Sequence, residues 1–145
     1  MLEYARNVAG LIGAGHTETD PDTETPLLVL AYCPIDANAV GGTRLAGSMK
    51  ISLIPNTIAH KIYGKRSIRE AFNCNYELNP EYRGELESHG LVVSGVSDTG
   101  RARIIELPDK RFFVATGFLP QLNLKPDKPH PLFTAFLLNT LEKQR

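Results

Sequence analysis

The residue with the clearest chemical potential is Cys74, which stands in the stretch FNCNYELNP at positions 72–80. A cysteine acts as a nucleophile through its thiolate, which forms readily only beside a cation or a helix N-terminus. The polar neighbours of Cys74 make packing in a hydrophobic core a poor explanation for it. A helix expected to begin at Pro80, together with Arg69 and Arg83, could supply the positive environment. Cys74 is therefore a candidate reactive thiol, and a buried small residue at a strand end is the alternative.

Other motifs for catalysis or metal binding are weaker. The stretch GLIGAG resembles a dinucleotide-binding loop, but it follows a predicted helix and precedes a polar loop, which is the wrong context. The absence of a GxSxG elbow disfavours a serine hydrolase. The histidines are scattered and do not pair at the spacing that metal ligands on one helix would need. They are His16, His60, His89 and His130. We therefore expect no cofactor and no bound metal.

Size, charge and cysteine content indicate the number of domains, the kind of partner and the cellular compartment to expect. The 145 residues fit one domain, and the 16 basic and 16 acidic residues give a formal net charge of zero. This balance does not predict a nucleic-acid partner. No apolar run approaches the roughly 20 residues that span a bilayer, and the N-terminus lacks the pattern of a signal peptide. The expected setting is cytoplasmic and reducing, where a structural Cys33–Cys74 disulfide is not favoured.

The hydrophobic pattern mixes helices and strands, which indicates the α/β class. We expect helices at 2–11, 56–64, 80–90 and from 131 onward. We expect strands at 27–33, 48–54, 67–73, 91–97, 102–107 and 111–118, with 91–97 and 102–107 forming a β-hairpin around DTGR. Asn56 and Asn79 are the expected N-caps. The last helix is predicted to have an apolar face made of Phe133, Phe136, Leu137 and Leu141.

Five segments, in order, resemble the glutaminase domain of CTP synthase, a class I glutamine amidotransferase domain. They are LEYARNVAGLIGAGHTETDPDTETP, GSMKIS, REAFNCNYEL, VATGFLPQ and KPHPLFTAFL. The resemblance implies a flavodoxin-like α/β sandwich with three layers. In that family about 90 further residues, an estimate from typical domain size, precede the first helix and supply parallel strands. We therefore expect residues 1–145 to form the C-terminal portion of a single domain that lacks its N-terminal strands. A homodimer is a candidate way to cover the exposed sheet edge.

The resemblance does not extend to the catalytic motifs. A class I glutaminase uses a cysteine nucleophile, a histidine base and a glutamate that orients the histidine. The family's F-H-P-E motif supplies the last two, and Leu119 and Gln121 stand at those positions here. The family's arginine-rich R-H-R-H-R run is replaced by residues 71–75, which removes cations that would hold a substrate carboxylate. The nucleophile position lies before the first helix of this chain.

A narrower resemblance is to the CTP synthase C-terminal region-related (seleno)protein family. Its C-N-Y-G-[LV]-N-P motif is matched by Cys74, Asn75, Tyr76, Leu78, Asn79 and Pro80. Glu77 replaces the glycine, and Cys33 also falls where this family carries a cysteine. Selenocysteine at the first motif position in some members implies redox or nucleophilic use of that atom.

Three functional hypotheses follow. The first is a glutaminase homologue that has lost glutamine hydrolysis and acts through the Cys74 thiol, with Tyr76 and Glu77 as polar neighbours. The second is a non-catalytic module that binds a small-molecule metabolite or regulates another protein. The third is a working glutamine amidotransferase, which would need upstream residues to supply the nucleophile.

Overall fold

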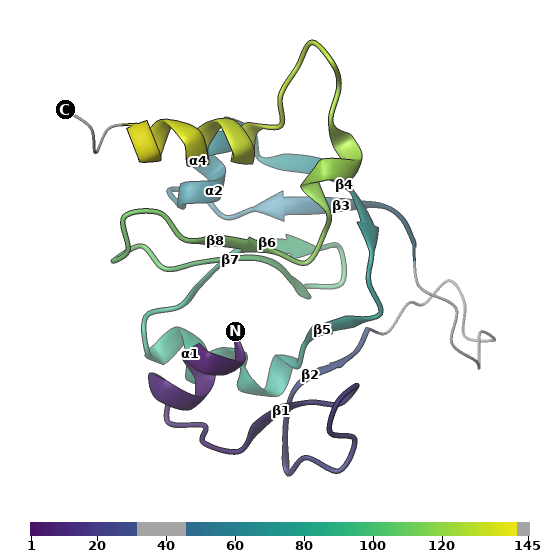
Figure 1. Ribbon diagram of the computed structural model, residues 1–145, viewed down its shortest axis with the longest axis vertical. Coiled ribbons are helices and arrows are strands. Elements are labelled where there is room, and N and C mark those ends of the chain that lie inside the picture. The colour runs from purple at the N-terminus through teal and green to yellow at the C-terminus, as the bar shows by residue number, and fades with distance from the viewer. Residues whose placement is uncertain (32–45, 142–145) are drawn as a thin grey trace.

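The computed structural model describes residues 1–31 and 46–141, so Cys33 lies outside the described residues. Figure 1 shows a mixed α/β arrangement built on two sheets. The smaller sheet has the order β1-β2-β5, with strands β1 (Ala14–His16), β2 (Thr25–Leu30) and β5 (Tyr76–Leu78). The larger has the order β4-β3-β6-β7-β8, with strands β3 (Ala46–Leu53), β4 (Ser67–Asn73), β6 (Val92–Ser97), β7 (Ala102–Glu106) and β8 (Val114–Thr116).

The helices are short except for the last. They are α1 (Leu2–Asn7), α2 (Ile58–Tyr63), α3 (Arg83–Ser88) and α4 (Pro131–Leu141), with 3₁₀ turns η1 (Pro80–Tyr82) and η2 (Pro120–Asn123). In Figure 1 α4 and α2 lie at the β3–β4 end of the molecule, whereas α1 and the smaller sheet lie at the other end. None of the described helices is long and apolar enough to cross a membrane.

Most of the predicted elements are present, and their ends follow local chemistry. The hairpin of β6 and β7 is antiparallel, as expected. Asn79 caps η1, because its side-chain oxygen accepts a hydrogen bond from the Glu81 N–H at 3.1 Å. The predicted Asn56 cap is wrong. Thr57 is the N-cap of α2 and accepts from the His60 N–H, while Asn56 lies one residue earlier with φ of 67°.

Two further expectations need correction. The first helix ends at Asn7 rather than near residue 11, with Gly10 at φ 71° in the turn that follows. The expected apolar face of α4 is not a buried face. Leu132 is the buried residue of that helix, whereas its other large apolar side chains are exposed. They are Phe133, Phe136, Leu137, Leu138 and Leu141.

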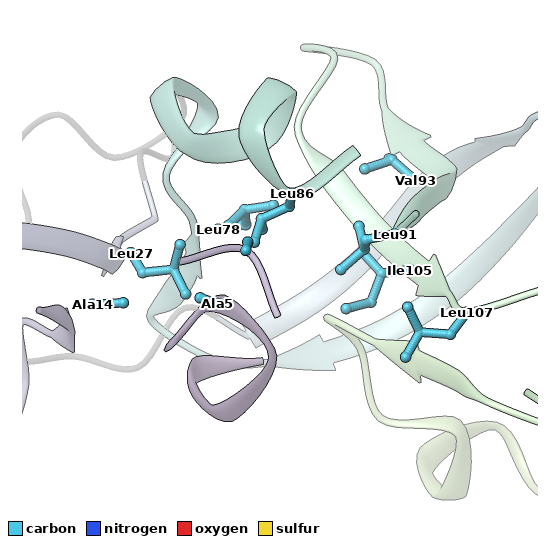
Figure 2. Packing of buried hydrophobic residues seen from close by; sticks show 10 residues of the cluster. Ala5, Ala14, Leu27, Leu78, Leu86, Leu91, Val93, Ile105 and Leu107 are labelled. Atoms are coloured by element: carbon cyan, nitrogen blue, oxygen red, sulfur yellow. The ribbon is translucent and has the colours of Figure 1, made fainter. Parts of the chain in front are cut away.

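Two apolar clusters hold the described parts of the chain together. Figure 2 shows the first, in which side chains of α1, α3 and both sheets meet. Its largest fully buried members are Leu27 and Leu86. The second cluster joins the larger sheet to α2 and α4 and contains Ile51, Leu53, Ala59, Ile104, Phe118 and Leu132. The clusters meet across β7, because consecutive strand residues point to opposite faces and Ile104 and Ile105 belong to different clusters.

A buried polar network ties β4 to α4. The Glu70 carboxylate accepts hydrogen bonds from Tyr63 Oη at 3.0 Å and Asn123 Nδ2 at 2.5 Å, and it lies 3.0 Å from His130 Nε2. Burial and the Glu70 carboxylate raise the pKa of the Tyr63 phenol far above its ordinary value, so the phenol stays protonated. The Leu132 N–H donates to His130 Nδ1 at 3.3 Å, so the other ring nitrogen, Nε2, is the one that contacts Glu70.

Gly95 of β6 is a position where only glycine fits. A Cβ there would lie 2.7 Å from Ile104 Cγ1 and 3.0 Å from Ile51 Cγ2. We expect Gly95→Ala to lower the free energy of unfolding by about 1–3 kcal/mol through overpacking. Gly84→Ala is the control, since a Cβ at that site in α3 meets nothing within 4 Å. The free energy of unfolding of Gly84→Ala should equal that of the native chain or exceed it by up to about 1 kcal/mol. Urea unfolding of the native chain and both variants measures these changes.

Candidate functional site

Cys74 lies in the short connection between β4 and β5. Its side chain is an exposed, free thiol. The sulfur lies 3.5 Å from both the backbone nitrogen and the carbonyl oxygen of Tyr76, which are weak contacts within one turn. The sulfur is therefore accessible and lightly held, in contrast to the alternative of a buried small residue.

The thiol stands at the wall of a pocket of about 240 Å³. The pocket brings together Cys74, Tyr76 and Glu77, the three residues predicted from the sequence as a candidate site. Residues from β1, β2, β5, β7 and β8 complete the lining, and the first residue of the chain and the glycine after β8 also contribute. They are Met1, His16, Leu28, Leu78, Ala102, Arg103, Ile105, Ala115, Thr116 and Gly117.

The polar side of this pocket is a buried ion pair that the sequence analysis did not identify. Glu77, whose side chain is 1% exposed, lies 2.7 Å from Arg103 Nη2 and 3.5 Å from Arg101 Nε. The Arg103 side chain is 12% exposed, and its buried Nε has no hydrogen-bond partner among the described residues. The signal was the spacing of two residues between Arg101, in the expected DTGR turn, and Arg103, in the strand expected at 102–107, since residues two apart in an extended chain share one face. Their pairing with a residue of β5 had no signature in the sequence.

An aromatic contact forms another part of the wall. The rings of Tyr76 and His16 have centroids 4.5 Å apart and are tilted by 57°. His16 Nδ1 accepts a hydrogen bond from the Glu18 N–H at 3.1 Å, which orients the ring. The Tyr76 ring is therefore packed against His16 in the wall of the pocket that Cys74 also lines.

The cations expected beside Cys74 lie elsewhere. Arg69 lines a different pocket, and Arg83 pairs with Glu87 on α3 at 3.2 Å. Arg103 is the cation that lines the Cys74 pocket instead. The η1 helix at Pro80 is only three residues long and is capped by its own Asn79. The sequence predicted a cation near the thiol but assigned the wrong residues, because only the β5–β7 contact reveals which arginine is near.

Leu119 and Gln121 do not line this pocket. Leu119 precedes η2, and its backbone N–H donates to the Ala71 carbonyl at 3.0 Å. Gln121 lies within η2 and is exposed. Gly117, two residues before Leu119, is part of the pocket wall, so the segment passes the pocket without contributing a base to it. The described residues contain no group of three or more His, Cys, Asp or Glu side chains that could hold a metal ion.

Comparison with known proteins extends these observations. No family model matches the chain. Among curated proteins, CTP synthase of Methanocaldococcus jannaschii is 42% identical over 142 residues, which is 97% of this chain and 26% of the relative. CTP synthase of Archaeoglobus fulgidus is 41% identical over 146 residues, which is 100% of this chain and 27% of the relative. The chain thus spans about a quarter of the length of these curated relatives.

A solved structure shows the same relationship. The glutaminase domain of Trypanosoma brucei CTP synthase with bound acivicin is similar at a TM-score of 0.87 and 27% identity. The match covers 97% of this chain and 55% of that one. The predicted α/β amidotransferase-like fold is confirmed. Over nearly its whole length, the chain is a homologue of the CTP synthase glutaminase domain.

Proposed function

We propose that this glutaminase-domain homologue does not hydrolyse glutamine and that the Cys74 sulfur is the reactive atom of its pocket. The substitutions at the family's F-H-P-E motif support the first part. Leucine at 119 has no lone pair to accept a proton, and glutamine at 121 brings no charge to stabilise an imidazolium. The narrower resemblance to the (seleno)protein family supports the second part, because it places a cysteine or selenocysteine at the position of Cys74.

The observation that carries the proposal is the position of the free thiol at the wall of the pocket. A thiol acts by forming a bond from its sulfur to an electrophilic carbon or sulfur, and that requires access. Cys74 has this access, and Glu77, Arg103 and Tyr76 provide polar groups around it. The arrangement suits a thiol-based redox or nucleophilic role on a small molecule.

Glutamine hydrolysis is the activity that the proposal excludes. We expect the purified chain to release ammonia from glutamine only at the rate of the buffer, and the Cys74→Ala variant to behave in the same way. A coupled assay that detects ammonia measures both rates. Release above the buffer rate by the native chain would overturn the first part of the proposal. Release that persists in the purified Cys74→Ala protein would establish conventional glutamine hydrolysis by a nucleophile other than Cys74.

A non-catalytic binding module is the second candidate, and the buried arginine favours it. Arg103 lines the pocket, its Nε has no hydrogen-bond partner among the described residues, and a guanidinium can bind the carboxylate of a metabolite. This function predicts that L-glutamate raises the melting temperature of a Cys74→Ser variant as much as that of the native chain. Arg103→Met should abolish the increase, whereas a purely thiol-based role predicts no such stabilisation.

A further inference from the structure

A second and larger pocket lies at the β4 edge of the larger sheet. It has a volume of about 660 Å³ and is bounded by β4, residues just before it and the segment 122–131. Among the described residues, five cations contribute to its lining, whereas Glu70 is the only acidic residue that does. The cations are Lys50, Lys65, Arg69, Lys125 and Lys128.

Four of the five cations are placed in like-charged pairs. Lys50 of β3 stands directly opposite Arg69 of β4 in the antiparallel register. Lys125 stands opposite Lys128 in an isolated antiparallel bridge. Like charges directly opposite each other destabilise a pair of strands. Two such pairs around one pocket raise its positive potential at a cost to the fold.

These charges are largely uncompensated within the described residues. Lys50 lies 3.5 Å from Asp98. No ion pair within 4.0 Å joins Lys65, Arg69, Lys125 or Lys128 to an acidic side chain in the described parts of the chain. These four residues are exposed, so their charges are available to a negative group that enters the pocket from outside.

Glu70 does not meet that demand. It is 4% exposed, and its oxygens are engaged by Tyr63, Asn123 and His130 in the pocket wall. The network instead fixes the wall, because it links β4 to the residues before α4. The N-terminal end of α4 also lines the pocket at Pro131 and adds the partial positive charge of the helix dipole.

Apolar side chains lie beside the cations. Leu122 and Leu124 line the same pocket and are 54% and 50% exposed. A pocket that combines four unpaired cations with exposed leucines suits a ligand with both a multiply charged anionic end and an apolar body. Inorganic ions alone would leave the leucines uncovered.

We propose that this pocket binds a small phosphate ester whose phosphate contacts Arg69 and the Lys125–Lys128 pair and whose apolar portion covers Leu122 and Leu124. Arginine and lysine both bind phosphate oxygens through charge-assisted hydrogen bonds. The site is distinct from the Cys74 pocket, since the two share no lining residue. The proposal is thus independent of the thiol chemistry.

Isothermal titration of the native chain with 1-naphthyl phosphate tests this site, and inorganic phosphate serves as the charge-only probe. We expect the ester to bind more tightly than inorganic phosphate and its affinity to fall as salt rises. The Lys125→Gln/Lys128→Gln double variant should bind the ester at least about tenfold more weakly, a change of about 1.4 kcal/mol.

A double variant with the same charge change outside the pocket is the matched control. Lys61→Gln/Lys110→Gln alters two exposed lysines that do not line the pocket, and its affinity should stay within about twofold of the native value, well under 1.4 kcal/mol. Leu122→Ser should weaken binding of the ester, whereas binding of inorganic phosphate should stay unchanged. Equal losses in both double variants, or no binding of the ester at millimolar concentration, would overturn the proposal.

Discussion

Replacing Glu106 with alanine is expected to lower the free energy of unfolding by about 3–5 kcal/mol. Glu106 is a fully buried carboxylate at the end of β7. It accepts hydrogen bonds from the Ile58 N–H at 2.8 Å and the Ala59 N–H at 3.1 Å, the first donors of α2. Alanine leaves both donors buried without an acceptor and removes the negative charge that the helix N-terminus favours.

Urea unfolding measures this loss, with the midpoint expected to fall and the slope to stay the same. Glu106→Gln should cost less than Glu106→Ala, because the amide oxygen still accepts one bond while the charge is gone. Glu85→Ala on the exposed side of α3 is the control and should change stability by less than about 0.5 kcal/mol. A Glu106→Ala loss as small as that of the control would show that the carboxylate does not hold α2 to the sheet.

The second large loss of stability is expected from a substitution in the Cys74 pocket. Glu77→Ala removes the acidic partner of Arg103 and leaves a mostly buried guanidinium without compensation. Breaking a buried ion pair in this way costs about 3–5 kcal/mol. We expect the lower end of that range, because Arg101, at 29% exposure, can turn to solvent once Glu77 is gone.

A double-mutant cycle separates the ion pair from the packing around it. Glu77→Gln/Arg103→Met replaces both charges, and such replacements of a buried pair are often neutral or stabilising. The double variant should therefore be more stable than Glu77→Gln alone. If the two substitutions were simply additive in urea unfolding, the Glu77–Arg103 contact would carry no coupling energy.

The sequence predicted the fold well where local chemistry decides it. Asn79 before Pro80 and glycine at 64 mark element ends that side-chain caps and left-handed backbone conformations set locally. The β6–β7 hairpin followed from two apolar runs around a turn. The start of α2 was ambiguous in the sequence, because Asn56 and Thr57 are both suitable N-caps. In the structure Thr57 is the N-cap, since its side chain accepts a hydrogen bond from the His60 N–H.

Tertiary contacts decided the features that could not be predicted. The strand at Tyr76–Leu78 forms because β2 pairs with it across more than forty residues of chain. The exposed face of α4 has the same composition as a buried one, so its pattern alone could not show which side packs. For the candidate site, Cys74, Tyr76 and Glu77 could be predicted together because they adjoin in sequence. Arg103 was missed because it reaches them only through the fold.

Alkylation of Cys74 tests the central claim most directly. A Cys33→Ser background leaves one thiol, and iodoacetamide labelling at neutral pH is followed by intact-protein mass in the folded chain and in urea. We expect one label per folded chain, added at least as fast as in the unfolded chain, because the thiol is exposed and lightly held at the pocket wall. A folded chain that resists labelling while the unfolded chain reacts would contradict it.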